Sequence, residues 1–308
     1  MRREDLADAD CGIAQALGVV GDWWTVLILR EIAGSVTRFD AIQQALGISR
    51  RALTERLGLL VEHGLLERRG YSEHPPRSDY LLTAKGEGFL PVLVALQEFG
   101  DRHVMGDGRL TATATSGAGE ARRVRALAGT RVPALSLPGH RGSEVSLRPE
   151  HGWRVVYLFP GAFAPRADGH PPGWDEIPGA AGCTLESTTY AARHPEFARA
   201  GADVVGVSTQ RPDQQAAYAR HARLPFTLAS DEQLRLATAL RLPLFRAGGA
   251  DRLKRCSLLL DATGVVRHIQ VPISDPAGSV DEMLAALREW RSRPSQSRES
   301  TPARPDST

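Results

Sequence analysis

Residues 21–103 carry the hydrophobic pattern of two helices around a tight turn, followed by a β-hairpin, and this pattern restricts the fold most. Apolar side chains recur at helical spacing over GDWWTVLILREI, RFDAIQQALG and ISRRALTERLGLLVEHGLL. Gly47 ends the second predicted helix, and Ser49 is placed to cap the third. This arrangement is the helix-turn-helix signature. The apolar positions are Trp24, Leu27 and Ile28, with Glu31 extending the face, then Phe39, Ile42 and Leu46, and then Leu53, Leu57 and Leu60.

A hairpin and a closing helix follow directly. LLERRGYSEHPPRSDYLLT reads as two strands joined by a tip at Pro75-Pro76, which predicts a wing beside the helices. AKGEGFLPVLVALQEFGDRH then predicts one amphipathic helix, with Phe89, Leu93, Leu96 and Phe99 along a single stripe.

Basic side chains gather on the parts of this motif that meet DNA in other helix-turn-helix proteins. The second helix of such a motif places its N-terminal residues in the major groove, and arginine and threonine can contact base edges and phosphates there. For any single arginine the alternative is a solvated surface charge. The arrangement as a whole favours DNA binding. The candidate DNA-binding residues are Arg50, Arg51, Thr54 and Arg56 on the helix and Arg68, Arg69 and Arg77 on the hairpin.

The stretch from Cys11 to about His103 resembles the HxlR family of winged-helix regulators. The matching segments are CGIAQAL from Cys11, GDWWTVLILRE, RFD, LTERL and PPRSDYLLT. The resemblance implies a homodimer formed largely by the terminal helices, bound to a palindromic operator of double-stranded DNA. It also implies redox sensing at Cys11, which lies just before a predicted helix whose dipole can lower a thiol pKa. The alternative is that Cys11 is a small apolar residue that packs at the dimer contact.

The 308 residues are enough for two domains, and a net charge of +2 decides nothing about nucleic acid. We expect a DNA-binding domain over 1–106, a linker over 107–130 that is flexible in its first half, and a disordered tail over 291–308. Strands and helices alternate over 131–290, which predicts an α/β domain. The expected fold is therefore an α+β winged-helix domain followed by an α/β thioredoxin-like domain.

Cys183 has the sequence setting of a reactive thiol. It precedes a helical pattern, and a helix N-terminus favours the thiolate form of cysteine. Arg255 opens the strand CSLLLD and is a plausible partner from elsewhere in the fold. A thiol peroxidase needs such a thiolate with a neighbouring arginine. The candidate catalytic residues are Cys183, Arg255 and Thr184.

Residues 131 to 290 resemble the peroxiredoxins, especially the branch of bacterioferritin-comigratory protein. The matching segments in order are RVPALSL, VVYLFP, GCT around Cys183, ADVVGVS, LPFTLASD and RCSLLLDATG. The resemblance implies that Cys183 reacts with peroxide, that Thr184 belongs to its turn, and that Arg255 is the active-site arginine.

Three departures from the peroxiredoxin pattern bear on activity. A long insertion from Gly161 to about Pro178 precedes the cysteine turn, Ala180 replaces a hydroxyl residue, and Thr188 occupies the position of a resolving cysteine. Cys256 follows Arg255 in a strand and is expected in the core. An oxidised Cys183 would then need an external thiol reductant, or its oxidation would itself be the signal.

The leading interpretation is a redox-responsive transcription regulator that binds DNA as a dimer and meets peroxide at Cys183. One alternative is a thiol peroxidase with a secondary DNA-binding domain. Another is a DNA-binding protein whose second domain has lost its activity. We expect no cofactor, metal or membrane partner, and the absence of a visible secretory signal and of a disulfide framework among three cysteines favours the cytoplasm.

Overall fold

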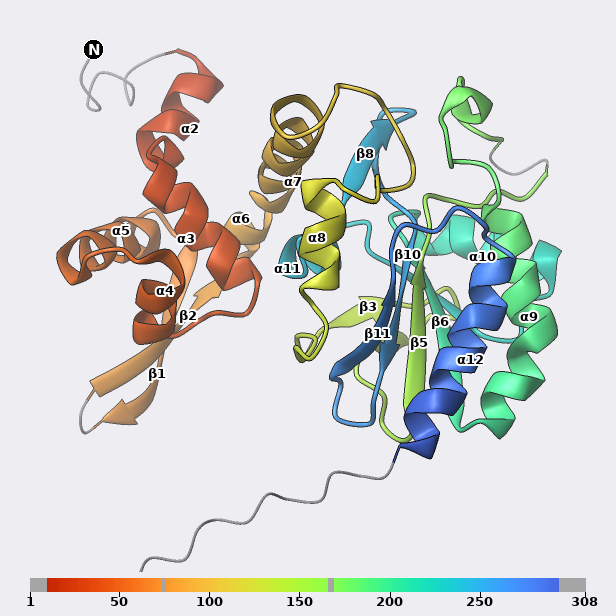
Figure 1. Ribbon diagram of the computed structural model, residues 1–308. Coiled ribbons are helices and arrows are strands. Elements are labelled where there is room, and N and C mark those ends of the chain that lie inside the picture. Colours follow the sequence, from red (N-terminus) through yellow and green to blue (C-terminus); the bar gives the residue numbers. More distant parts are fainter. Residues whose placement is uncertain (1–9, 74–75, 166–168, 294–308) are drawn as a thin grey trace, which may run out of the picture.

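The structure is a computed structural model, and it describes residues 10–73, 76–165 and 169–293. A helical part with a hairpin lies beside a larger part built on a β-sheet (Figure 1). Within the described ranges, no single helix is long and apolar enough to cross a membrane. Gly12–Val20 and Trp23–Ala33 meet that criterion only together, as a pair bent by 77°.

Among the residues that the structure describes, the first part opens with four helices, and local caps explain where two of them begin. The Asp22 carboxylate accepts hydrogen bonds from the backbone N–H of Trp24 at 2.9 Å and of Thr25 at 3.3 Å, and the Ser49 hydroxyl accepts one from Ala52 at 3.2 Å. Gly47 adopts φ +64° and separates the two helices of the predicted motif. The predicted helices and the Ser49 cap are confirmed. The elements are α2 (Gly12–Val20), α3 (Trp23–Ala33), α4 (Phe39–Leu46) and α5 (Arg50–Glu62).

The predicted hairpin is present as β1 (Leu66–Glu73) and β2 (Pro76–Leu82), which pair antiparallel with Leu66 opposite Leu82. The hairpin projects away from the helices at the lower edge of this part (Figure 1). Of the tip predicted at Pro75-Pro76, Pro75 lies outside the described residues. The helices and the base of the hairpin share one apolar core that includes Ile28, Ile42, Leu53, Leu57, Leu60 and Leu66.

The closing helix differs from the prediction of one continuous amphipathic element. It is divided into α6 (Ala84–Glu87), α7 (Leu90–Phe99) and a π-helical turn, η1 (Gly100–Val104). Leu93 is buried, but Leu96 and Phe99 are 52% and 58% exposed. The break near Gly88 precedes the predicted stripe, so Phe89, Leu93, Leu96 and Phe99 all lie on α7 or at its N-cap, and α7 packs on α3 and on α11 (Arg235–Ala239) of the second part. The core of this chain covers Leu93 and leaves Leu96 and Phe99 exposed.

The second part is a thioredoxin-like fold around a mixed sheet of five strands in the order β11-β10-β5-β6-β7. The strands β5, β6 and β7 run parallel, whereas β10 is antiparallel to β5 and β11 is antiparallel to β10. The sheet strands are β5 (Trp153–Leu158), β6 (Ala202–Ser208), β7 (Thr227–Ser230), β10 (Cys256–Leu260) and β11 (Val266–Gln270). Two short hairpins pair β3 (Ser136–Pro138) with β4 (Glu144–Ser146) and β8 (Leu244–Ala247) with β9 (Ala250–Leu253).

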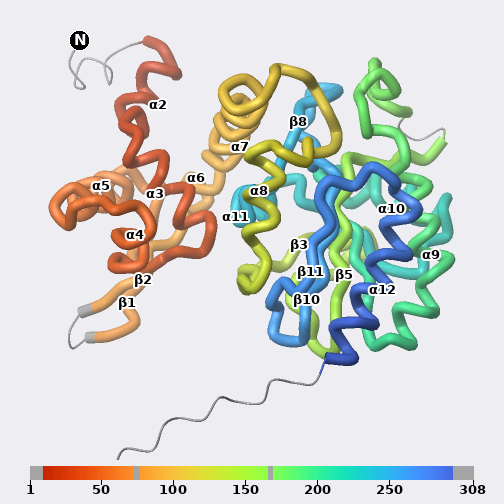
Figure 2. Tube along the Cα trace, in the orientation of Figure 1, coloured from red at the N-terminus to blue at the C-terminus, as the bar shows by residue number. Residues whose placement is uncertain are grey.

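The sheet separates two cores, because alternate residues of a strand face opposite sides. Val155 and Tyr157 face the core that includes residues of α9 (Cys183–Arg199) and α12 (Gly278–Ser292). Val156 and Leu158 face the core that includes α8 (Gly119–Arg125), α11 and Val94 of α7. The trace of Figure 2 shows α8 and α11 between the sheet and the helical part. The first part of the chain thus contributes a side chain to a core of the second. The remaining elements are α10 (Pro212–Ala222) and the 3-10 turn η2 (Trp174–Glu176).

The segment 107–130 differs from the flexible linker that its composition predicted. Ala112, Ala121 and Val124 are fully buried, and residues 119–125 form α8. A segment rich in small side chains has the composition of a linker, but small side chains also allow its backbone to pack close to the sheet. At the other end, α12 continues to Ser292, past Arg291 where the tail was predicted to begin. Residues 294–308 of that tail lie outside the described residues.

Candidate functional site

Cys183 is the first residue of α9 and is 3% exposed. Gly182 precedes it with φ +100°, a backbone conformation that favours glycine and turns the chain into the helix. The Cys183 Sγ lies 3.3 Å from Nη2 of Arg255, and the two residues are 72 positions apart in the sequence. The two predicted catalytic residues are therefore in contact. Thr184 follows in α9 with an exposed side chain, and its carbonyl accepts the Thr188 hydroxyl at 2.8 Å.

A buried carboxylate completes this arrangement. Arg255 and Glu186 are both fully buried and form an ion pair through Nη1 and Oε2. Nη2 of Arg255 also donates to the carbonyl oxygen of Ala181 at 3.1 Å, so the guanidinium is held in place. Glu186 was absent from the predicted site. The signal that could have found it is its spacing of three residues from Cys183, which puts both side chains on one face of α9.

The groups around Cys183 shift the pKa of its thiol in opposite directions. Burial raises the pKa of the Cys183 thiol, while the positive charge of Arg255 and a hydrogen bond from the Gly161 backbone lower that pKa. The negative charge of Glu186 raises it again. Burial also raises the pKa of Glu186 to about 7, against the opposing effect of Arg255. Arg255 therefore favours the thiolate of Cys183, and burial and the ionised Glu186 oppose it.

The other two cysteines lie elsewhere. Cys256 is fully buried in β10 opposite Leu158, and burial raises its pKa to about 12, as expected for a core residue. Cys11 is exposed at the start of α2. Figure 1 places α2 and α9 on opposite sides of the molecule, so Cys11 and Cys183 of one chain do not meet in this arrangement.

A second polar surface lies between α4, the start of α5 and the hairpin. Its groove is lined by four arginines together with Phe39 and Tyr71. The guanidinium of Arg50 lies 4.9 Å from the Phe39 ring centre and pairs with Asp40 at 3.1 Å. Arg51 and Thr54 are exposed on α5, and Arg69 pairs with Glu67 at 2.8 Å. The arginines of the groove are Arg38, Arg50, Arg68 and Arg77.

Two positions on this surface differ from the predicted set. Arg56 is turned toward the protein, where Nε lies 2.8 Å from Asp22 and Nη1 lies 2.9 Å from Glu55. It therefore connects α5 to the cap of α3, and its helical spacing gave no sign of that contact. Arg38 was not among the candidates, although it lines the groove with its guanidinium 4.9 Å from the Tyr71 ring centre.

Comparisons with known proteins divide the chain in the same way. The HxlR-like helix-turn-helix family matches residues 19–107, and the AhpC/TSA family matches residues 177–269. Peroxiredoxin Bcp of Escherichia coli is 32% identical over 146 residues, which are 46% of this chain and 83% of that protein. The chain is a member of the peroxiredoxin family that also carries an HxlR-like helix-turn-helix domain.

The HxlR-like domain has relatives of its own. An uncharacterised HTH-type transcriptional regulator of Mycobacterium tuberculosis is 42% identical over 92 residues, which are 30% of this chain and 58% of the regulator. This chain thus spans little more than half the length of that relative. Among solved structures, the peroxidoxin BcpB of M. tuberculosis is 26% identical with a TM-score of 0.45, covering 54% of this chain and 98% of that one.

We expect Glu186→Gln to shift the reactivity of Cys183 in the peroxiredoxin domain to lower pH. Removing the carboxylate leaves Arg255 with the thiolate as its anion, which lowers the pKa of Cys183. The difference should be largest above pH 7, where Glu186 of the wild type is ionised. The measurement is the rate of Cys183 alkylation by iodoacetamide as a function of pH.

Glu196→Gln is the matched control, because Glu196 is a carboxylate on the same helix that pairs with Arg288 at 2.8 Å on the surface. Its pH profile should equal that of the wild type. An unchanged or raised midpoint in Glu186→Gln would contradict the assigned role of Glu186.

Proposed function

We propose that this chain is a DNA-binding regulator whose affinity for DNA changes when Cys183 is oxidised by peroxide. The observation that carries the proposal is α8, which lies between the two domains and has a charged contact with each. We take residues 1–106 and 131–290 as the functional units, and α8 as the part of the intervening segment that couples them.

On the peroxiredoxin side, α8 contacts the segment that carries the active-site arginine. Glu120 of α8 pairs with Lys254 at 2.9 and 3.0 Å, and both side chains are buried. Lys254 immediately precedes Arg255. The backbone N–H of Arg255 donates to the carbonyl of Ala112 at 3.0 Å, so the segment leading to α8 lies against the same residue. A displacement of Arg255 would therefore act directly on α8.

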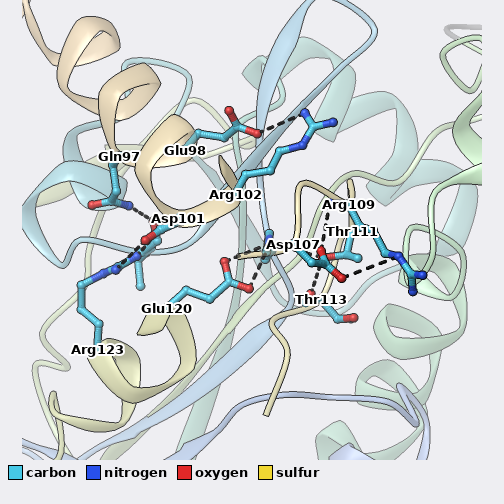
Figure 3. Close-up of polar contacts among 12 residues, drawn as sticks. Gln97, Glu98, Asp101, Arg102, Asp107, Arg109, Thr111, Thr113, Glu120 and Arg123 are labelled. Carbon is cyan, nitrogen blue, oxygen red and sulfur yellow. Dashed lines mark hydrogen bonds and ion pairs between the residues drawn. The ribbon is translucent and has the colours of Figure 1, made fainter. Parts of the chain in front are cut away.

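On the DNA-binding side, the contacts involve η1, α3 and α7. Arg123 of α8 forms a bidentate ion pair with Asp101 of η1, in which its two terminal nitrogens lie 2.5 and 2.9 Å from the two carboxylate oxygens (Figure 3). The loop after α11 adds two contacts. Arg241 pairs with Glu31 of α3 at 2.6 Å, and Gln97 of α7 donates to the carbonyl of Leu242 at 2.7 Å. Helix α3 packs on α5, which carries Arg50 and Arg51, and on α4, whose N-cap is Arg38.

The reaction proposed to alter DNA affinity is the oxidation of Cys183 by a hydroperoxide, and it needs no cofactor. The Cys183 thiolate attacks the terminal oxygen of a hydroperoxide, the O–O bond breaks, and the leaving alkoxide takes a proton and departs as an alcohol or water. Cys183 is left as a sulfenic acid. An external thiol then attacks the sulfenic sulfur and releases water, and a second thiol displaces Cys183 as a thiolate. The added oxygen lies beside Arg255 and competes with Glu186 for its guanidinium.

The DNA partner is proposed from the arginine groove and from family membership. The domain would bind a palindromic operator of double-stranded DNA as a homodimer in the cytoplasm. Large apolar side chains exposed on α2, α7 and η1 support a dimer contact at the terminal helices. Exposed Cys11, at the start of α2, would lie near that contact and could sense oxidants there. These apolar residues are Ile13, Leu17, Val92, Leu96, Phe99 and Val104.

We expect Arg50→Gln and Arg68→Gln each to weaken DNA binding and to reduce the salt dependence of affinity by about one counterion. Both arginines line the groove, and each would neutralise a phosphate. The measurement is a fluorescence anisotropy titration at several salt concentrations. Arg109→Gln is the control, because Arg109 is an exposed arginine paired with Asp107 outside the groove. Equal slopes for the groove variants and the wild type would contradict this interface.

A thiol peroxidase is the second candidate function, favoured by the 3.3 Å contact between Cys183 and Arg255. If the chain is a thiol peroxidase, each molecule should reduce many molecules of peroxide when an external thiol is added. The regulator predicts instead that DNA affinity differs between reduced and peroxide-treated protein, and that this difference requires Cys183.

A further inference from the structure

Arg252 of β9 is a buried cation without an anionic partner. It is 7% exposed, and its Nε is shielded from solvent with no hydrogen bond. Within the part of the chain that the structure describes, its side chain makes no hydrogen bond or ion pair. A guanidinium carries five N–H donors, and a buried charge is normally paired. A cation in this state needs an explanation.

The charged residues next to Arg252 in the sequence each have a partner. Asp251 pairs with Arg246 at 2.9 Å, Lys254 pairs with Glu120, and Arg255 pairs with Glu186. None of these carboxylates is free to serve Arg252. Trp174 and Phe245, which lie beside Arg252, pack in one apolar cluster with Ala180, and the Ala180 carbonyl accepts the Cys183 thiol at 3.4 Å. Burial lowers the pKa of Arg252, and the negative charge of an ionised Cys183 opposes that effect.

Aromatic rings surround the guanidinium. Its central carbon lies 5.7 Å from the ring centre of Phe163 and 5.9 Å from that of Trp174. Both rings belong to the insertion that precedes the cysteine turn. Phe245 lies opposite Arg252 in the β8–β9 register and 6.2 Å from Trp174. Ring faces attract a cation, but they accept none of its directed hydrogen bonds.

We propose that Arg252, Phe163 and Trp174 form a subsite that binds the carboxylate of small molecules that react with Cys183. A guanidinium matches a carboxylate with two parallel hydrogen bonds, and the rings suit an apolar body attached to it. The insertion supplies this subsite. The natural ligand rests on the proposed function: it is a carboxylate-bearing hydroperoxide, or a carboxylate-bearing thiol that reduces Cys183.

The test compares two alkylating reagents of similar size, one with a carboxylate and one with a neutral amide. These are iodoacetate and iodoacetamide, and with either reagent the thiolate displaces iodide. Mass spectrometry of the full chain gives the rate ratio of the two reagents at Cys183, with exposed Cys11 as the reference in the same molecule. We expect the iodoacetate-to-iodoacetamide ratio to be about tenfold higher at Cys183, the effect of one charge-assisted hydrogen bond.

Arg252→Gln should bring this ratio down to that of Cys11, and Arg252→Lys should keep much of it. Arg288→Gln is the control, an exposed arginine of α12 that pairs with Glu196 away from the β8–β9 hairpin, and it should change nothing. A wild-type ratio no higher than that of Cys11 would overturn the proposal without any variant. So would a ratio that Arg252→Gln leaves unchanged, or a Cys183 that neither reagent reaches.

Two further comparisons separate the sources of the carboxylate. Cys183 oxidation by a fatty-acid hydroperoxide is compared with oxidation by its methyl ester, and sulfenic acid reduction by mercaptopropionate is compared with reduction by mercaptoethanol. If Arg252→Gln removes the preference for the carboxylate reagent in one of these two comparisons, that comparison identifies the natural ligand. If Arg252→Gln leaves the preference unchanged in both comparisons, the subsite is overturned. If no peroxide oxidises Cys183, the proposed function fails, while the alkylation ratio still decides the subsite.

Discussion

Replacing Cys183 with serine should abolish formation of sulfenic acid at this position and reduce peroxide consumption by about a thousandfold or more. A serine hydroxyl is far less nucleophilic than a thiolate, and among the described residues no base contacts Cys183 that could activate it. Arg255 and the Gly161 backbone stabilise an anion at this position, and the carbonyl of Ala180 accepts the thiol hydrogen bond. The measurements are peroxide consumption and the mass of the peptide that holds residue 183 after trapping with dimedone.

Cys256→Ser and Cys11→Ser are the controls for this prediction. Cys256 is fully buried with its pKa raised to about 12, so its replacement should leave peroxide consumption unchanged. Cys11 is exposed at the start of α2, and Figure 1 shows α2 on the opposite side of the molecule from α9, which begins at Cys183, so its replacement should also spare the oxidation of Cys183. If Cys183→Ser consumed peroxide at the wild-type rate, a residue other than Cys183 would be the one that reacts with peroxide.

Replacing Glu120 with glutamine should lower the free energy of unfolding by about 3 kcal/mol or more. The change leaves the Lys254 ammonium buried without its anion, which is the costly way to break such a pair. Lys254 keeps only the Thr111 hydroxyl, at 3.3 Å, of the partners present in the wild type. Urea unfolding monitored by circular dichroism measures the difference.

The double variant Glu120→Met with Lys254→Met separates stability from communication between domains. Two apolar side chains of similar length remove both charges together, and we expect stability close to that of the wild type. Cys183 should still be oxidised in this variant, but the effect of oxidation on DNA affinity should shrink. Glu120→Gln with wild-type stability would contradict the buried state of the pair.

Features that depend on neighbouring residues were the ones the sequence could predict. The helices α3, α4 and α5 follow from apolar spacing, and their boundaries follow from Gly47 and Ser49, all within a few residues. Cys183 could be recognised as reactive because it precedes a helix. Its contact with Arg255 spans 72 residues, and the resemblance to peroxiredoxins predicted it where spacing alone could not.

The failures share a physical cause, which is packing between segments that are distant in sequence. Its place near the start of the recognition helix predicts Arg56 as a DNA contact, but Asp22 pairs with it from the start of α3. The segment 107–130 looked like a linker because a composition of small residues carries no sign of the buried pair of Glu120 and Lys254. Arg252 gave no signal at all, since only the folded insertion places Phe163 and Trp174 around it.

The most direct test of the regulator is the affinity of the full chain for DNA from upstream of its own gene, measured by anisotropy before and after hydrogen peroxide. Wild-type protein should change its affinity by about fivefold or more, a typical coupling between two sites. Thiol reductant should restore the starting value, and Cys183→Ser should show no change. Equal affinities for reduced and oxidised wild type, or a full response that persists in Cys183→Ser, would contradict the account.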